Sequence, residues 1–353
     1  MKKDFKGIPM KRICVIGHFG FGFNLLNGQT IKTKIVTKAL EDKVGTSEVQ
    51  KIDTHGGKSA YLRLPIQMLK GLKECSNIII FPAHNGVRVI VPLLVFLNYF
   101  FKRKIHYIVI GGWLPNLCKK KKWLSEKLKA IDSIYVETNT MKSELEKQGF
   151  QNIIVMPNFK NLSILDENEL VYSEKEPFAL CTFSRVMKEK GIEDAIEAVI
   201  SVNSHLGRIA YTLDIYGQVD MEQEEWFEVL KKSFPKYVRY KGCVPFEQAV
   251  DVLKSYFALL FPTRFFTEGI PGTIIDAYAA GVPVIVSKWE SSDDVIEEKT
   301  TGLCYEFFDE KGLYNILRDV INNPTIVNSM KVACIKKANS YISRTAINKI
   351  DLK

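Results

Sequence analysis

The sequence lacks the patterns that mark a secreted, disulfide-bonded or zinc-binding protein. Its seven cysteines are scattered with no C-x-x-C pair, and its five histidines form no H-E-x-x-H motif. This usage is typical of a reducing compartment and argues against a disulfide framework or a zinc site. The opening residues, MKKDFKGIPMKR, contain no apolar segment of the signal-peptide type. We therefore expect a cytoplasmic protein.

A long hydrophobic run is also missing. The most apolar segment, residues 89–101, contains Pro92 and is too short to span a bilayer. Charge is unevenly divided: residues 1–160 carry 27 Lys and Arg against 11 Asp and Glu, whereas residues 161–353 carry 22 against 29. A basic half indicates an anionic contact, either nucleic acid or an anionic membrane. No nucleic-acid recognition motif accompanies the charge, so nucleic acid is not the expected partner.

Two basic clusters lie beside apolar and aromatic residues. One is residues 102–104, next to Phe100 and Phe101, and the other is residues 119–122, next to Trp123. Such neighbours favour a lipid-facing surface, with a solvated basic face over ordinary core helices as the alternative. The hypothesis is peripheral contact with the inner face of the plasma membrane.

The length of 353 residues and the 46% hydrophobic content predict two domains. Short apolar strands alternate with helical segments twice, which predicts two parallel sheets. The expected strands are residues 12–17, 49–53, 78–82, 105–110, 133–137 and 153–156, then 178–183, 211–216, 238–241, 258–261 and 283–286. Among the helices between them, one is expected near residues 66–73 and a hydrophobic one at about 87–101. The expected division is a first domain over 1–160, a polar linker over 161–177, a second domain over 178–335 and a C-terminal helical segment over 336–353 that returns to the first domain.

Residues 261–286, FPTRFFTEGIPGTIIDAYAAGVPVIV, are the most informative stretch. Glu268 precedes a turn, and Asp276 lies eight positions later in the helix that follows. Gly269, Gly272 and Thr273 carry small side chains, so backbone N–H groups at the helix start are open to an anion. Carboxylates beside an anion site suit a ligand that has both phosphate and hydroxyl groups. A nucleotide sugar has both.

A second pattern follows the first strand of the second domain. In the segment FSRVMKEKG, Arg185 and Lys190 lie five residues apart in a turn that leads into a helix. Open α/β sheets bind ligands at the carboxyl ends of their strands, and two cations there can neutralise a diphosphate. Alone, the pair is a weak signal, because loop cations are usually solvated.

Together these patterns resemble the retaining GT-B glycosyltransferases of family 4, also called group 1. Glu268 matches the first acid of the family motif, whereas Asp276 stands where the family has a second Glu. Arg185 and Lys190 match the family's cations, followed by Gly191. The sequence Thr301-Gly302-Leu303 resembles a later turn of the family. In the first domain, Gly28 and Gln29 occupy the place of a glycine pair. The family's reactive-centre histidine is replaced by a Gly-Gly-Trp sequence that ends in Trp113.

The resemblance implies an α/β protein of GT-B type, with two facing Rossmann-like domains, parallel sheets and an interdomain cleft. It implies transfer of a sugar from a nucleotide-diphosphate donor to a glycan or lipid-linked acceptor, with retention, in cell-surface polysaccharide synthesis such as capsule or lipopolysaccharide. The implied catalytic residues are Glu268, Arg185, Lys190 and, as a substitute histidine, His84. The implied donor-binding residues are Gly28, Gln29, Val244, Gly269, Gly272, Thr273, Ile274 and Asp276.

No cofactor is expected beyond the nucleotide sugar, and no metal, since side chains can neutralise the phosphates. Two alternatives remain open. One is a nucleotide-sugar epimerase of the same fold, and the other is a non-catalytic nucleic-acid-binding protein that uses the basic half. A lone His84 is more often structural, and Asp276 can be a solvated helix residue. A dinucleotide fingerprint near Gly17 lacks its third glycine at the required spacing.

Overall fold

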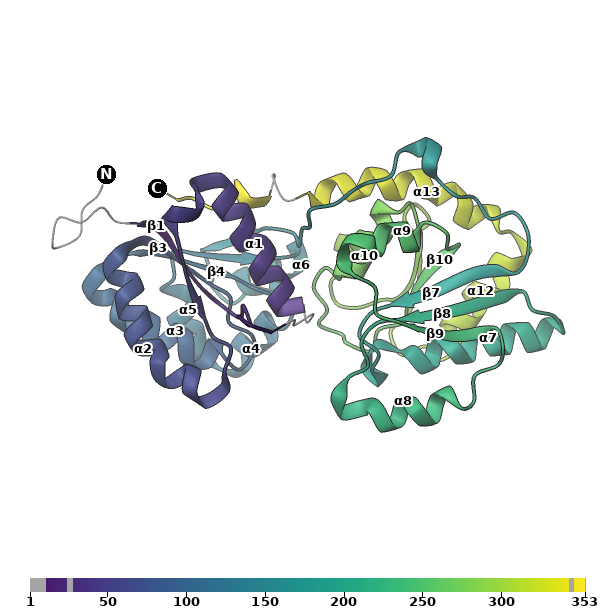
Figure 1. Ribbon diagram of the computed structural model, residues 1–353, viewed down its shortest axis with the longest axis horizontal. Helices are drawn as coiled ribbons and strands as arrows, with labels where there is room; N and C mark the ends of the chain where they lie inside the picture. The colour runs from purple at the N-terminus through teal and green to yellow at the C-terminus, as the bar shows by residue number, and fades with distance from the viewer. Residues whose placement is uncertain (1–10, 24–27, 343–345, 353) are drawn as a thin grey trace. The chain divides into compact units, whose positions relative to one another are not determined.

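The computed structural model describes residues 11–23, 28–342 and 346–352. For residues 58–61 it describes the backbone alone. The chain forms two compact units. The first contains Met1–Asn161 together with Ser343–Lys353, and the second contains Leu162–Ile342. Each unit is a parallel sheet with helices on both faces, so the predicted α/β class with two parallel sheets is confirmed (Figure 1).

The first unit has a six-stranded parallel sheet in the order β2-β1-β3-β4-β5-β6. Its strands are β1 (Lys11–Gly17), β2 (Val49–Asp53), β3 (Cys75–Ile80), β4 (Lys104–Ile108), β5 (Ser133–Val136) and β6 (Ile153–Val155). The central strands are buried on both faces, which explains their continuous runs of Ile and Val. The strand order reverses between β1 and β3, because β2 lies on one side of β1 and the later strands lie on the other. A ligand-binding crevice is therefore expected beyond the carboxyl ends of β1 and β3.

Helices cover both faces of this sheet. They are α1 (Gly28–Val44), α2 (Gly57–Glu74), α3 (Val87–Phe101), α4 (Leu114–Lys120), α5 (Lys122–Lys129) and α6 (Asn139–Glu146). The last five pack on one face through residues such as Met68, Leu94 and Leu128. The other face is covered by α1 and by C-terminal residues, including Ile347 and Ile350. The end of the chain therefore belongs to the core of the first unit.

The second unit has six parallel strands in the order β12-β11-β10-β7-β8-β9. They are β7 (Phe178–Phe183), β8 (Tyr211–Tyr216), β9 (Val238–Gly242), β10 (Ala258–Phe261), β11 (Val284–Ser287) and β12 (Gly302–Tyr305). The order reverses between β7 and β10. This is the strand order of a Rossmann sheet, which places the ligand crevice beyond the carboxyl ends of those two strands.

Seven helices flank the second sheet: α7 (Ile192–Leu206), α8 (Glu224–Lys231), α9 (Ala249–Leu253), α10 (Gly272–Ala279), α11 (Ser292–Val295), α12 (Gly312–Asn322) and α13 (Thr325–Ala338). Helices α7, α8 and α12 build one apolar layer, and α9, α10 and α11 build the other. Helix α13 contributes to both through Met330 and Cys334.

The segment over residues 161–177, which the sequence analysis treats as a linker, packs on the second unit. Leu165 and Leu170 are buried against Ile335, and the N–H of Leu165 donates to the carbonyl of Ala279. Polar composition concealed these two leucines, because only the fold brings α10 and α13 beneath them.

Several elements differ from the sequence expectation. Helix α2 begins at Gly57 and continues through Pro65, whereas the pattern indicated a helix near residues 66–73. The segment around Gly302, interpreted as a turn, is strand β12. Helices α4, α5 and α8 were not foreseen, because they are short and their charged residues obscure the apolar period. No described helix is both long and apolar enough to cross a bilayer. All seven cysteines are free thiols.

One buried histidine makes the stability of the first unit depend on pH. His106 on β4 is 1% exposed, and its ring lies within hydrogen-bond distance of the Tyr135 hydroxyl and the Asn77 side chain. Burial lowers the pKa of His106 from 6.5 to about 4. Between these two values the unfolded chain binds more protons than the folded one, so stability falls as the pH drops through this window.

We predict that acidification from pH 6.5 to pH 4 lowers the free energy of unfolding through His106 by about 3 kcal/mol, at about 1.4 kcal/mol per pKa unit. Urea unfolding across this range should show a shallower pH slope in His106→Gln than in the native chain. His205→Gln, at an exposed position on α7, is the control and should keep the native slope. An unchanged slope in His106→Gln would contradict the assignment.

Candidate active site

Three loops of the second unit, those that follow β7, β8 and β10, pack closely against one another. Gly191 and Gly217 allow this approach, since both have positive φ angles, of 67° and 135°. A Cβ atom at Gly191 would lie 1.9 Å from the carbonyl oxygen of Pro262, and one at Gly217 would lie 1.8 Å from that of Ser184. Only glycine is compatible with both the backbone angle and the available space. The loops are therefore held in fixed positions around the end of β7.

Lys190 and Glu268 form an ion pair at this meeting point. Lys190 comes from the loop after β7 and Glu268 from the loop after β10, so 78 residues of chain separate them. Their side chains are only 17% and 15% exposed. The hydroxyl of Thr263 also donates to Oε1 of Glu268 at 3.0 Å. The structure thus joins two of the residues that the sequence analysis selected as catalytic.

Two aromatic rings border the Lys190 ammonium group. Its Nζ atom lies 5.3 Å from the ring centre of Phe261 and 5.0 Å from that of Phe265. Aromatic faces attract cations and exclude water from one side of the charge. A partly desolvated cation interacts more strongly with a bound anion than a solvated one does. Neither ring could be selected from the sequence, because no pattern shows which side of the loop a side chain faces.

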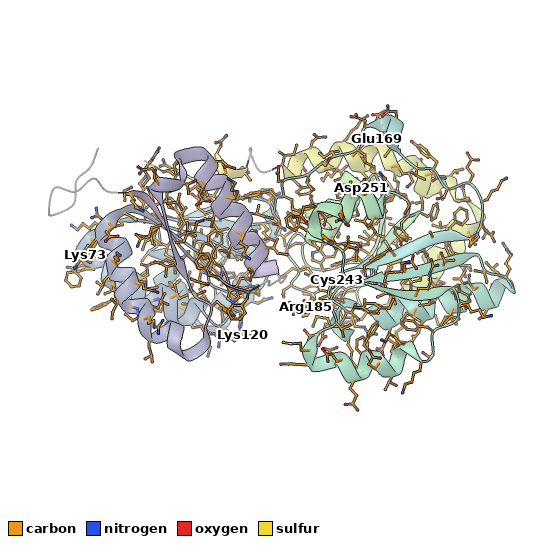
Figure 2. The ribbon with its side chains drawn as sticks, viewed as in Figure 1. Lys73, Lys120, Glu169, Arg185, Cys243 and Asp251 are labelled. Carbon is orange, nitrogen blue, oxygen red and sulfur yellow. The ribbon has the colours of Figure 1, made fainter. Side chains whose placement is uncertain are left out.

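Arg185 lies on the same loop as Lys190 but has a different partner. Its Nη1 atom is 3.2 Å from Oδ2 of Asp220, and its side chain is 46% exposed. A backbone bridge between Val186 and Val219 fixes the two loops beside each other. Figure 2 labels Arg185 beyond the end of β7 and Cys243 beyond the end of β9. Asp220 was not selected from the sequence, although an acid soon after the end of β8 is a usable signal.

The start of α10 carries several predicted donor-binding residues. Gly272 is the first helical residue, and Gly269 is buried in the turn before it. Within the described residues, the N–H groups of Gly272 and Thr273 donate to no acceptor. The Oγ1 atom of Thr273 is also buried without a partner there. This helix end therefore presents donors to an anion.

The remaining donor-side predictions occupy varied environments. Ile274 is fully buried and packs in the core of the second unit. Asp276 is 6% exposed, so it is not a solvated helix residue. Val244 follows β9 and is half-buried against the same core. The N–H of Gly217 donates to the carbonyl of Gly242 at 2.9 Å, which holds the loop after β9 beside the loop after β8.

In the first unit, His84 and Gln29 lie near the end of β3. His84 is exposed, its ring centre is 5.3 Å from that of Trp113, and its Nε2 atom is 3.4 Å from the Arg88 guanidinium. The side-chain amide of Gln29 donates to the carbonyl of Phe81 at 3.2 Å. Gly28 is the first residue of α1. Both β1 and β3 thus carry predicted residues at the point where the strand order reverses.

A polar cluster in the first unit was missed from the sequence. The Nδ1 atom of His18 is 2.8 Å from Oγ1 of Thr30, and its Nε2 atom is 3.0 Å from Nδ1 of His55. Burial and the neighbouring His55 lower the pKa of His18. Asp53 accepts hydrogen bonds from the backbone of the loops that follow β1 and β2. These residues follow different strands, so spacing alone could not reveal the cluster.

Lys32 and Glu137 form a second unforeseen ion pair, buried between α1 and the end of β5, with side chains 5% and 3% exposed. Removal of one partner would leave a buried charge without compensation, which typically costs 3–5 kcal/mol. The pair therefore anchors α1, and with it Gly28 and Gln29, to the carboxyl end of the first sheet.

Comparison with known proteins adds an independent finding about the second unit. Residues 177–323 match the family model of the glycosyl transferases group 1. Among curated relatives, the UDP-N-acetylglucosamine–peptide N-acetylglucosaminyltransferase GtfA subunit of Streptococcus gordonii is 26% identical over 157 residues. The amylovoran biosynthesis glycosyltransferase AmsK of Erwinia amylovora is 27% identical over 176 residues. These alignments cover 44% and 49% of this chain but only 30% and 41% of the two relatives.

Solved structures match over nearly the whole chain. HepE of Anabaena, crystallised with UDP and glucose, superposes with a TM-score of 0.72 at 12% identity and covers 96% of this chain and 97% of its own. At such identity the likeness establishes the fold alone. The fold is GT-B, as predicted. Together with the group 1 match, it supports a GT-B glycosyltransferase.

The loop contacts at Gly191 give a testable consequence. Gly191→Ala should lower the free energy of unfolding by several kcal/mol, because its Cβ would displace the Pro262 carbonyl. Gly207→Ala is a matched control with a similar φ of 63° and no atom within 4 Å of the added Cβ. It should cost only about 1–2 kcal/mol of left-handed strain. Equal losses of stability in the two variants, measured by urea unfolding, would contradict this account.

Proposed function

We propose that the protein transfers a sugar from a nucleotide-diphosphate donor to a glycan or lipid-linked acceptor with retention of anomeric configuration. The observation that carries the proposal is the Lys190–Glu268 pair beside the open N–H groups of α10. These groups lie in loops that follow β7 and β10, where a Rossmann sheet binds nucleotides. The group 1 match over residues 177–323 supports the same assignment.

The diphosphate is proposed to bind between the cations and the start of α10. Arg185 and Lys190 supply positive charge, and Gly272 and Thr273 supply N–H donors. Each cation already has a carboxylate partner, Asp220 or Glu268, which fixes its position in advance. Charge that develops on the leaving nucleotide during bond cleavage is then stabilised by groups that need little reorganisation. In this scheme side-chain cations fulfil the role of a metal, and the nucleotide sugar needs no further cofactor.

Glu268 is proposed to change partners when the donor binds. Its carboxylate is shared between Lys190 and Thr263. Once the diphosphate takes part of the Lys190 charge, Glu268 can accept hydrogen bonds from hydroxyls of the sugar and orient the ring. Asp276 is proposed to accept hydrogen bonds from the ribose hydroxyls. With retention, the acceptor hydroxyl attacks on the face from which the nucleotide departs, so no protein nucleophile is required.

The first unit is proposed to bind the acceptor, with His84 as its candidate catalytic side chain. His84 is an exposed side chain at the end of β3 and contacts Trp113. The relative from Erwinia amylovora is named for amylovoran biosynthesis, which supports a polysaccharide pathway such as capsule or lipopolysaccharide assembly. A cytoplasmic location is part of the same proposal.

Substitutions in the proposed donor site should cause large losses of activity. Glu268→Gln and Arg185→Ala should each reduce turnover by about 100-fold or more, since each removes a charge aimed at the donor. Arg208→Ala is the matched control, because Arg208 is also an exposed arginine paired with a carboxylate, that of Glu176. The assay is nucleotide release with a panel of nucleotide sugars and acceptors. Native rates in both donor-site variants would refute the site.

Membrane contact is proposed for the exposed face of α3 and α5. Phe96, Tyr99 and Phe100 on α3 are 66%, 77% and 67% exposed, and Trp123 on α5 is 50% exposed. Exposed lysines at 102 and 120–122 lie close to these aromatic residues in the sequence. Aromatic side chains beside basic ones are typical of surfaces that insert into anionic lipid headgroups. A lipid-linked acceptor would be reached from such a surface.

Vesicle sedimentation tests this contact. The native chain should bind vesicles that contain anionic lipid, and added salt should weaken the binding. Replacement of Phe96, Tyr99 and Phe100 by serine should reduce the bound fraction at least about tenfold, since each ring contributes apolar burial. Phe308→Ser, at a ring in the second unit that is 69% exposed, is the control and should bind normally. Equal binding of both variants would contradict the proposal.

A further inference from the structure

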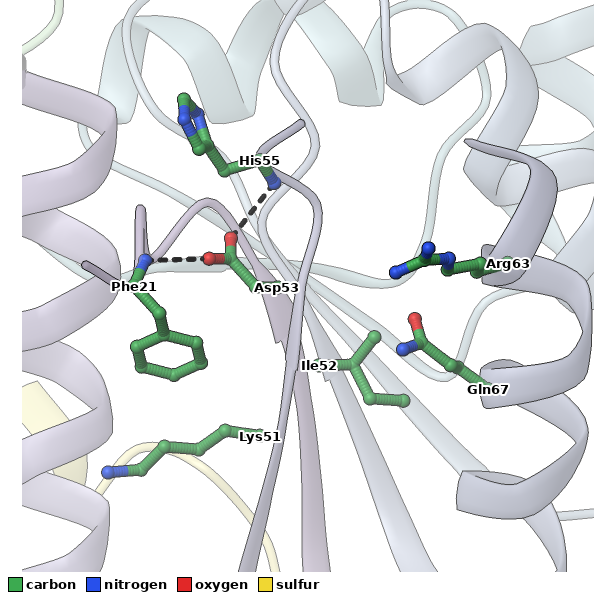
Figure 3. Close-up of a pocket in the computed structure, with 7 residues that line it drawn as sticks. All are labelled: Phe21, Lys51, Ile52, Asp53, His55, Arg63 and Gln67. Carbon is green, nitrogen blue, oxygen red and sulfur yellow. Dashed lines mark hydrogen bonds between the residues drawn. The ribbon is translucent and has the colours of Figure 1, made fainter. Parts of the chain in front are cut away.

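A pocket of about 340 Å³ in the first unit lies along the edge strand β2. Its walls come from the end of β2, from the loops after β1 and β2, and from α2. It is distinct from the proposed donor site, which belongs to the second unit. Its volume falls in the range of small-molecule sites. Figure 3 shows Arg63 and Gln67 projecting from α2 toward one side of β2, while Phe21 and Lys51 lie on the other side, so the pocket extends across the exposed edge of this strand.

Asp53 fixes the loops that form this pocket. Its Oδ1 atom accepts from the N–H groups of Phe19 and His55, and its Oδ2 atom accepts from the N–H of Phe21, all at 2.9 Å. Burial raises the pKa of the Asp53 carboxyl, but these backbone donors outweigh it and hold the pKa below its ordinary value. The carboxylate is thus ionised and occupied by the backbone. Its charge is largely balanced by the donors it orders.

The other charges of the pocket are not balanced in the same way. Lys51 is paired with Glu41 at 2.7 Å, whereas Arg63 forms no ion pair with a carboxylate of the described residues. Gln67 lies one turn further along α2 and adds an amide with two donors and an acceptor. The guanidinium of Arg63 therefore remains available as a planar, two-pronged donor to an anion.

An aromatic surface completes the pocket. The ring of Phe21 is 56% exposed and is stacked on Phe19 at a centroid distance of 5.0 Å. The ring of His55 is held by His18 and by an edge contact with Phe23. A fixed ring with an open face provides apolar contact for the C–H face of a sugar, which the polar groups alone do not offer.

We propose that this pocket binds an anionic saccharide, a sugar that carries either a phosphate or a carboxylate group. Arg63 pairs with the anionic group, Gln67 bonds to adjacent hydroxyls, and Phe21 contacts the ring. The inference rests on the proposed function only in identifying this saccharide as part of the acceptor. Binding itself is independent of transfer.

Calorimetric titration of the full chain, with saturating UDP to occupy the donor site, tests the inference. The probes are glucose 6-phosphate, glucuronate, methyl glucoside and inorganic phosphate. We expect one or both of the anionic sugars to bind, and their relative affinity distinguishes phosphate from carboxylate. Arg63→Gln should weaken this binding at least about tenfold, because a charge-assisted pair is lost. Lys70→Gln, at an exposed cation on the same helix, should leave it unchanged.

A second variant tests the contact with the sugar ring. Phe21→Leu should weaken binding of the anionic sugars several-fold and leave inorganic phosphate unaffected. Inorganic phosphate that binds as tightly as glucose 6-phosphate would overturn the saccharide assignment. Absence of binding by every probe, or equal losses in Arg63→Gln and Lys70→Gln, would overturn the site itself. A separate titration of UDP alone, if negative, would count against the proposed transferase and leave the result for the pocket intact.

Discussion

The close approach of three loops around the end of β7 is the constraint on which the second unit depends. Gly191 and Gly217 leave no room for a side chain, so the loops after β7, β8 and β10 meet in backbone contact. This contact brings Lys190 against Glu268 and sets Phe261 and Phe265 beside the ammonium group. The charged groups therefore hold their geometry before any ligand arrives, as the proposed stabilisation of a leaving nucleotide would require.

The first unit uses a carboxylate for a comparable purpose. Asp53 gathers backbone N–H groups from the loops after β1 and β2, and so shapes one wall of the pocket that contains Arg63. Buried Lys32 and Glu137 attach α1 to the same end of the sheet. In both units, ionic groups at the carboxyl ends of parallel strands organise loops, and the apolar sheet beneath supplies rigidity.

Much of the fold could be read in advance, because parallel strands that are buried on both faces appear as uninterrupted apolar runs. Strands such as β7 and β10, and helix α3, have the boundaries that the pattern predicted. Helices α4, α5 and α8 escaped notice, since short helices with many lysines or glutamates show little apolar period. The pairing of Lys190 with Glu268 was likewise invisible, although both residues had been selected.

The sequence alone determined the two α/β alternations, the basic character of the first half, and the residue types at the proposed donor site, because each depends on local composition and order. Tertiary structure decided which charges meet. Lys190 contacts Glu268, Arg185 contacts Asp220, and His18 contacts His55. Each pair is formed because the sheet brings together loops that follow different strands. The order of strands in a sheet is set by how helices pack across its faces, and that packing depends on contacts far apart in the chain.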